Sequence, residues 1–255
     1  MLAMPSIAGL LRRTRRLPVK IIRVAVNTVG WGAEDLRERP APDLQMSPGR
    51  AAIELAALLI LIETIMWVVP LLPHPRATYA GFAVMIALLL AYCFIRDDFS
   101  AWQLGFRADN FFRVLLDLAP FLILFVAVIL GIAGLTGDVR FKPRFFSMVL
   151  VVPFWAIFQQ YMLLAFANRR LRVILGKGAV STVATAALFA LLHVPNPALV
   201  VATAVGGYLW TWEYERRPNI MANSITHGIA SAFLANLLPH WLLKNMVVGY
   251  NYYLR

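Results

Sequence analysis

Five polar side chains interrupt apolar stretches in the second half of the chain. They are the neighbouring amides Gln159 and Gln160, the imidazoles His193 and His227, and the hydroxyl of Ser231. Histidine is a general acid or base near neutral pH, whereas a carboxamide can orient a water molecule but cannot take its proton. Polar groups are costly inside a membrane, so those found there point to function. Together the five predict one polar pocket at membrane depth.

Spacing along helices indicates which groups can meet. Phe189 and His193 are four residues apart, as are His227 and Ser231, so each pair shares one helix face. Neighbouring residues such as Gln159 and Gln160 lie about 100° apart on a helix and present their amides across a broad sector. An alternative for each residue taken singly is a hydrogen bond between helices that only supports packing.

Acidic residues in the apolar stretches have separate interpretations. Glu63 lies in the middle of the first predicted span. Glu54 and Asp117 lie near span ends, where the side chain can extend to the membrane surface, and we expect no special role for them. The single cysteine, Cys93, cannot form an internal disulfide and is expected to be a buried thiol.

Composition excludes most soluble classes. The chain has 255 residues, of which 60% are hydrophobic and 15% charged, against soluble norms of about 45–50% and 25%. A core of this size cannot hide so much apolar surface, so lipid must solvate much of the protein. An ordinary cytosolic enzyme, a disordered chain and a disulfide-stapled secreted domain are therefore excluded.

Apolar runs predict an all-α, polytopic integral membrane bundle of six to eight transmembrane helices, since each span needs about 20 apolar residues. The predicted spans are 51–72, 78–95, 114–135, 145–167, 179–193, 199–212 and 220–238. The segment 241–253 is either an interfacial helix or a partial eighth span. The segment 99–113 mixes aromatic with charged residues and suits an interfacial helix or loop.

Charge divides the chain into a basic arm and a membrane domain. Residues 1–50 hold nine basic and four acidic residues and predict an amphipathic arm with a linker, followed by a membrane-embedded domain over 51–255. The remaining excess of the +11 net charge is scattered over short connections, which favours lipid headgroups over nucleic acid as the partner. Basic residues cluster in the even-numbered connections, which predicts a cytoplasmic N-terminus. The basic residues of the third connection do not fit this orientation.

Short motifs between about residues 102 and 239 resemble the CPBP family of intramembrane proteases, which includes CAAX prenyl endopeptidases. Its second motif, Phe-x-x-x-His, stands at Phe189 to His193, and its third appears as His227 to Ser231. The family's connection between these motifs is similar to Gly206-Gly207-Tyr208 and to the stretch 214–219. Its segment before the third span is similar to 104–107. The resemblance implies a membrane helical bundle.

The first motif departs from the family pattern. Where the family has Glu-Glu followed four residues later by Arg, this chain has Gln159, Gln160 and Leu164. The resemblance implies that the first glutamate and the motif-two histidine activate water while the third motif stabilises the oxyanion. The equivalent positions here are Gln159, His193, His227 and Ser231. A carboxamide is a poor base and a poor zinc ligand, so we expect no metal and no cofactor.

Three functions remain open. The first is a non-catalytic relative that acts as a membrane scaffold or binding subunit for lipid, a membrane protein, or a hydrophobic or prenylated peptide. The second is an active endopeptidase with an altered mechanism, using His193 or Glu63 as base. The third, a transporter or channel, ranks last because no duplicated half is evident. Each places the protein in the cell membrane, either plasma or bacterial inner membrane.

Overall fold

The computed structural model describes residues 43–137 and 144–254, and every regular element in these ranges is helical. The predicted basic arm falls largely on residues 1–42, outside the described part. The elements are α3 (Pro48–Glu63), α4 (Pro75–Asp97), α5 (Phe111–Thr136), α6 (Arg144–Gln160), α7 (Arg169–Leu175), α8 (Ala179–Leu191), α9 (Pro197–Arg216), α10 (Ile220–Leu237) and α11 (His240–Leu243). The all-α prediction is confirmed.

Within the described ranges, four helical segments are long and apolar enough to cross a membrane, with α8 a shorter apolar helix. They are Pro48–Leu71, Pro75–Asp97, Phe111–Thr136 and Phe145–Leu175. Many of their large apolar side chains face outward, among them Leu88, Leu116 and Leu150. Exposure of this kind is expected where the surrounding solvent is hydrocarbon. The protein is therefore an integral membrane bundle by length and composition.

Helix starts follow local capping chemistry. Ser47 accepts a hydrogen bond from the backbone of Arg50, Asn196 from Leu199, and Asn219 from Ala222. A side-chain acceptor at this position satisfies one of the unpaired amides in the first helical turn. The first two of these caps are followed by proline, which suits the first helical position. These caps fix where α3, α9 and α10 begin.

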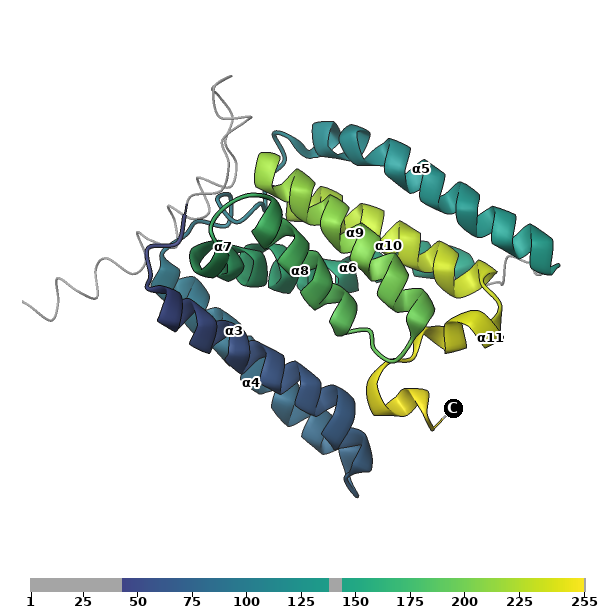
Figure 1. Cartoon of the computed structure of the whole chain (residues 1–255), viewed down its shortest axis with the longest axis horizontal. Coiled ribbons are helices and arrows are strands. Elements are labelled where there is room, and N and C mark those ends of the chain that lie inside the picture. Colours follow the sequence, from purple (N-terminus) through teal and green to yellow (C-terminus); the bar gives the residue numbers. More distant parts are fainter. Residues whose placement is uncertain (1–42, 138–143, 255) are drawn as a thin grey trace, which may run out of the picture.

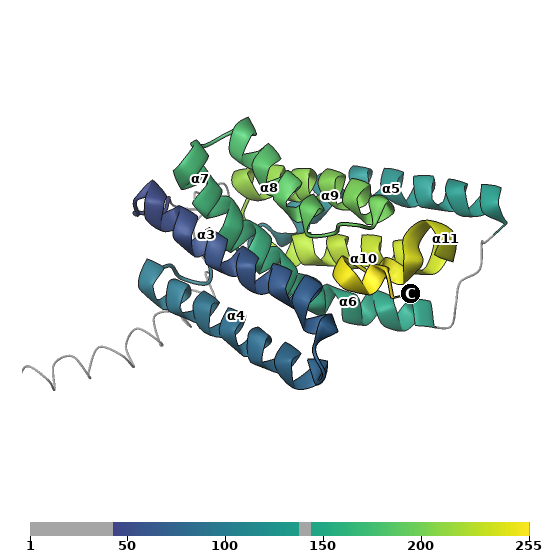
Figure 2. The same cartoon turned by 60° about the horizontal axis from the view of Figure 1, so that its bottom comes forward.

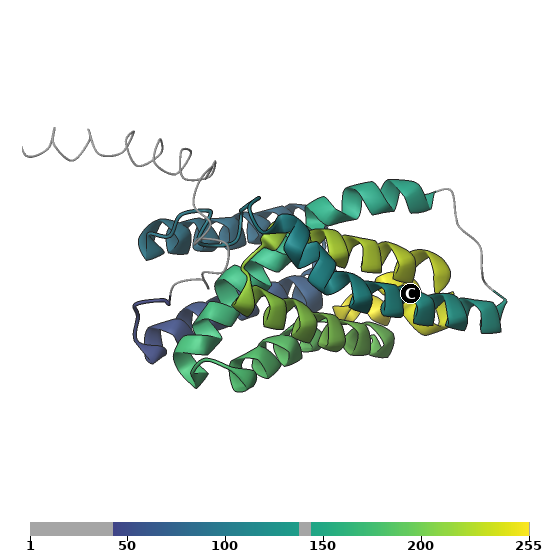
Figure 3. The same ribbon diagram turned by 90° about the horizontal axis from the view of Figure 1, so that it is seen from above.

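Helix α10 lies at the centre of the bundle. It packs on α6 and α5 and more lightly on α9, while α8 packs along α9 (Figure 1). Its close approach to α6 needs Gly228, since an added Cβ would lie 2.5 Å from Pro153 Cγ. The pair α3 and α4 stands to one side and joins the bundle through α7, as a second view shows (Figure 2). Seen from above, α5 and α6 extend together beyond α8 (Figure 3).

The structure decides between the alternatives that the sequence left for segments 241–253 and 99–113. The stretch 241–253 holds only the end of α11 and two 3₁₀ turns, Lys244–Met246 and Gly249–Tyr252. It is too short to span and returns to the first span, where Gly249 packs closely on Met66. The stretch 99–110 is a loop of turns. Gly105 in this loop has φ +96° and accepts a hydrogen bond from the amide of Ile220, which anchors the loop to the start of α10.

The α6 segment continues through an irregular turn. Residues Tyr161–Asn168 are π-helical and join α6 to α7 in one long segment. A second π-helical stretch, Thr64–Val68, follows α3. Such bulges occur often at functional sites. Here the longer one begins directly after Gln160, the residue whose amide reaches α10.

Candidate functional site

The predicted site residues come from three elements that meet inside the bundle. Gln159 and Gln160 end α6, His193 follows α8, and His227 and Ser231 lie on α10. The side chain of Gln160 is fully buried, and its Nε2 lies 3.2 Å from Nδ1 of His227. In this arrangement the amide donates and the ring nitrogen accepts. The other amide atom, Gln160 Oε1, is buried with no hydrogen-bond partner among the described residues.

Aromatic rings enclose His227. Trp210 stacks on the imidazole, with ring centroids 4.4 Å apart and an interplanar angle of 29°. Phe189 approaches the same imidazole edge-on at 5.8 Å. Trp210 in turn donates from Nε1 to Thr226 Oγ1 at 3.1 Å, which fixes the indole against α10. These contacts hold His227 in one orientation within an apolar wall.

His193 lies in the turn just after α8, two residues beyond its last helical residue. Its ring is 4.9 Å from Phe189, edge-on, so Phe189 stands against both histidines. A carbonyl oxygen only accepts, so the 2.7 Å contact between His193 Nδ1 and Phe189 O places the proton on Nδ1. In the neutral ring, Nε2 then keeps its lone pair. His193 is half-buried, so this nitrogen belongs to the more accessible imidazole of the two.

The structure therefore brings Gln160, His193 and His227 together. Gln159 is half-buried and makes no side-chain hydrogen bond within the described residues, so its part in the site stays a prediction. Ser231 is buried one turn after His227 on α10, as the spacing predicted. The four-residue spacing of Phe189 and His193 also gives the predicted contact, although His193 lies beyond the helix end.

Trp210 is the site residue that sequence reasoning missed. A usable signal was the glycine pair just before it in α9. A Cβ on Gly206 would lie 2.8 Å from the indole of Trp210, and one on Gly207 would lie 3.2 Å from the Phe189 ring. The two glycines make room for the two rings that surround His227.

No ion pair to a carboxylate is present at either histidine in the part of the chain that the structure describes. Leu164, at the position of the family's arginine, is fully buried in an apolar cluster with Leu104, Val114 and Trp210. Glu63 is the last residue of α3 and is half-buried. No group of three His, Cys, Asp or Glu side chains suited to a metal ion occurs among the described residues.

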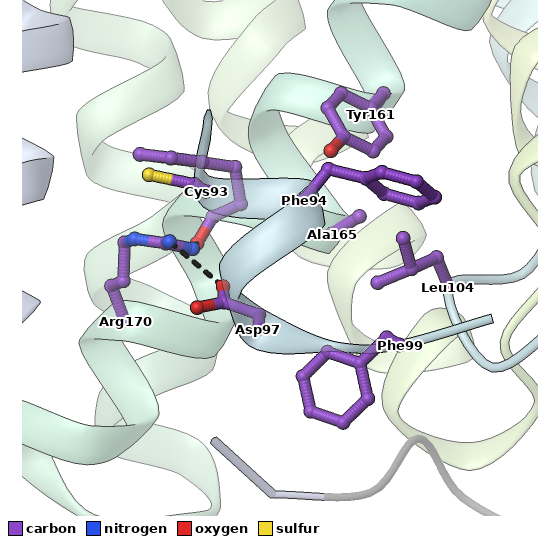
Figure 4. Close-up of a pocket in the computed structure, with 9 residues that line it drawn as sticks. Cys93, Phe94, Asp97, Phe99, Leu104, Tyr161, Ala165 and Arg170 are labelled. Atoms are coloured by element: carbon purple, nitrogen blue, oxygen red, sulfur yellow. Dashed lines mark hydrogen bonds and ion pairs between the residues drawn. The ribbon is translucent and has the colours of Figure 1, made fainter. Parts of the chain in front are cut away.

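A second buried polar cluster lies away from the histidines. The Arg170 guanidinium bonds Asp97 Oδ2 at 3.1 Å (Figure 4). It also bonds Glu54 Oε2 at 2.8 Å, and Arg96 bonds both acids as well. Arg170 is 1% exposed and Glu54 is 7% exposed. The expectation that Glu54 extends to the membrane surface is therefore wrong, because two arginines from other helices hold it inside. The cavity beside this cluster is about 10 Å³, at most one water molecule.

A comparison with known families adds one finding. Residues 141–233 match the family model of type II CAAX prenyl endopeptidases of the Rce1-like kind. The matched range contains both glutamines, both histidines and Ser231. No curated protein and no solved structure matches the chain.

Proposed function

Since residues 141–233 carry an Rce1-like type II CAAX prenyl endopeptidase domain, we propose that this membrane protein keeps the family's pocket but not its hydrolytic chemistry. It would act as a scaffold or binding subunit for a hydrophobic or prenylated peptide. The observation that carries the proposal is the fully buried Gln160 amide on His227. A neutral amide stands where the family's paired acids would supply a base.

The loss of charge involves the whole motif. A buried carboxylate needs a cation or several donors to be stable, and a buried arginine needs an acid. Here Gln159 and Gln160 stand in place of two glutamates, and Leu164 stands in place of an arginine. Leu164 packs in an apolar cluster. All three positions therefore hold uncharged side chains, which supports binding without proton transfer.

Retained groups support the binding role. Trp210 and Phe189 give the site a lining of buried aromatic rings, against which a prenyl chain or apolar side chain that enters it would bury area. His193, half-buried with Nδ1 committed to Phe189 O, offers one polar group beside them. A peptide with an apolar group and a nearby hydrogen-bonding group suits this combination.

The second candidate is an active endopeptidase that uses His193 as base. The specific observation in its favour is the His193 tautomer, since a proton on Nδ1 leaves the Nε2 lone pair available to accept a proton from water. This mechanism would lack the carboxylate that the resemblance places beside the histidine, at Gln159. We rank it below the binding role.

The deciding experiment is a cleavage and binding assay on the full-length protein in lipid nanodiscs. The probe is a fluorescent farnesylated CAAX-type peptide, with the unprenylated peptide as reference. We expect the parent protein to bind the farnesylated peptide and not to cleave it. The double variant Gln159→Glu/Gln160→Glu tests for recovered hydrolysis, and Gln103→Glu, in the loop before α5, is the matched control for an added acid.

The outcomes separate the two candidates. Cleavage by the parent that His193→Ala abolishes would contradict the binding role and support the histidine mechanism. Equal binding of the two peptides, or no binding, would contradict the prenyl-binding role. Thermal unfolding of each variant distinguishes a lost function from a lost fold.

We also propose that the N-terminus and the connection after α7 face the cytoplasm of a plasma or bacterial inner membrane. The basic residues of α7 and of this connection, between Arg169 and Lys177, support this orientation. The test is membrane-impermeant labelling of Lys177→Cys in a Cys93→Ala background. Protection in intact cells with labelling after lysis is expected, and labelling of intact cells would reverse the orientation.

A further inference from the structure

A basic cavity lies at one end of the first and fourth spans. It has a volume of about 180 Å³ and is lined by Asp43, Leu44, Arg169, Arg172, Val173 and Lys177. About 15 Å³ is enough for one water, so this cavity holds a group of several heavy atoms. It is much larger than the roughly 10 Å³ cavity beside Arg170. It is also separate from the histidine site, with which it shares no residue.

Its charges are unequal. The described lining contains three basic side chains, Arg169, Arg172 and Lys177, and one carboxylate, Asp43. Asp43 bonds Arg172 Nη2 at 3.1 Å and Lys177 Nζ at 2.6 Å, but its side chain is 46% exposed and lies at the rim. Inside, Arg169 is 3% exposed and lies over the Phe99 ring. Among the described residues that line the cavity, basic side chains therefore outnumber acidic ones by three to one.

One donor in the cavity has no acceptor. Arg172 is a side chain only 10% exposed, and its Nε is buried without a hydrogen-bond partner in the described part of the chain. An unpaired buried donor on a charged group is unfavourable, so an anion that accepts a hydrogen bond from it is favoured. A guanidinium suits a phosphate especially well, because its planar set of N–H groups matches two phosphate oxygens.

The position of the cavity indicates the source of the anion. Arg169, Arg172 and Val173 belong to the last turns of the span Phe145–Leu175, and Leu44 lies just before the span that begins at Pro48. The end of the fourth span and the start of the first span both lie at the level where a transmembrane segment reaches lipid headgroups. Basic pockets between membrane helices at this level bind anionic headgroups.

We propose that this cavity binds the phosphodiester of an anionic phospholipid headgroup, with Arg172 as the principal donor and Lys177 at the entrance. Phosphatidylglycerol is the simplest such lipid, since its headgroup carries one net negative charge. Phosphatidylcholine carries the same phosphate but its choline cancels the charge, so it is the matched reference. The proposal is independent of the role assigned to the histidine site.

The test is native mass spectrometry of the full-length protein in detergent, with retained lipid counted as a function of added lipid. Separate arms contain phosphatidylglycerol, phosphatidylcholine with the same acyl chains, and inorganic phosphate. Each basic group near a membrane surface is worth about fivefold in affinity. Lys177→Gln, whose side chain is 62% exposed and safe for folding, is expected to weaken phosphatidylglycerol retention about fivefold, and Arg172→Gln/Lys177→Gln roughly 25-fold.

Arg113→Gln is the control, because it removes the same charge from a side chain that is 65% exposed and outside the cavity. It is expected to leave retention unchanged. Equal retention of the two lipids, or full retention by the double variant, would overturn the proposal. Displacement of phosphatidylglycerol by inorganic phosphate at equal concentration would show that the cavity takes free phosphate and would overturn the lipid assignment. Thermal unfolding confirms that each variant is folded.

Discussion

Two clusters of buried polar side chains lie in one bundle and differ in charge. Around His227, the described neighbours are an amide and aromatic rings. Around Arg170, two carboxylates and two guanidinium groups from three helices pair with one another. In the second cluster each charge has an opposite charge in contact, whereas in the first an amide oxygen stays unpaired.

The difference bears on how charges are arranged inside the bundle. In a low-dielectric interior a charge is stable only with its partner, so acids and bases must be removed together or kept together. The Arg170 cluster contains both the acids and their arginine partners, and it joins α3, α4 and α7. At the histidine site, Gln159, Gln160 and Leu164 stand in place of a full set. The charged cluster therefore holds helices together, whereas the neutral site is the one for which we propose a ligand.

The largest effect is expected from Arg170→Met, which removes the most buried cation of the cluster and leaves Glu54 and Asp97 with Arg96, whose side chain is 19% exposed. Breaking a buried ion pair from one side costs about 3–5 kcal/mol, so the free energy of unfolding should fall by that amount. Denaturant titration in mixed micelles measures it. Arg50→Met is the matched control, since Arg50 bonds the same Glu54 carboxylate at 3.0 Å but is 45% exposed, and its loss should stay under about 1 kcal/mol. Equal losses would contradict the special role of the buried pair.

Sequence patterns predicted the helices well because apolar runs report directly on lipid contact. They also placed Phe189 against His193 and Ser231 one turn after His227, because these relations lie within one helix or its first turn. Contacts between residues on different helices could not be predicted from these patterns. Glu54 was misplaced because its arginine partners are 42 and 116 residues away. Trp210 was missed because only the packing of α9 on α10 brings its ring to His227.

Gly228→Ala is expected to have the second largest effect. It tests the close packing of α6 on α10, the two helices that carry Gln160 and His227. The added Cβ would lie 2.6 Å from the backbone nitrogen of Pro153, so the helices must move apart. Overpacking of this kind costs about 1–3 kcal/mol. Thermal unfolding measures the loss. Gly134→Ala on α5 is the control, since nothing lies within 4 Å of its added Cβ, and a loss there as large as at Gly228 would contradict the close approach.

Gln160→Met tests whether the histidine site is the weaker of the two clusters. It removes one neutral hydrogen bond to His227, worth about 1 kcal/mol, and an amide oxygen that is already unpaired. The expected loss in unfolding free energy is therefore about 1 kcal/mol, well below that of Arg170→Met. Gln160→Glu keeps the shape and adds a buried charge, so it should cost more than Met. The reverse order would mean that the site already accommodates a carboxylate.

The smallest effect is expected from Gln159→Ala, and it separates stability from function within the first motif. Gln159 is half-buried and makes no hydrogen bond among the described residues, so its removal should change the unfolding free energy by no more than about 0.5 kcal/mol. In the proposed equivalence with the family, Gln159 stands at the position that would activate water. Stability and farnesylated-peptide affinity are measured on the same sample. Unchanged stability with weakened affinity would assign Gln159 to the ligand. A stability loss equal to that of Gln160→Met would mean that both amides hold the helices together, and that the difference between the neutral site and the charged cluster is only one of strength.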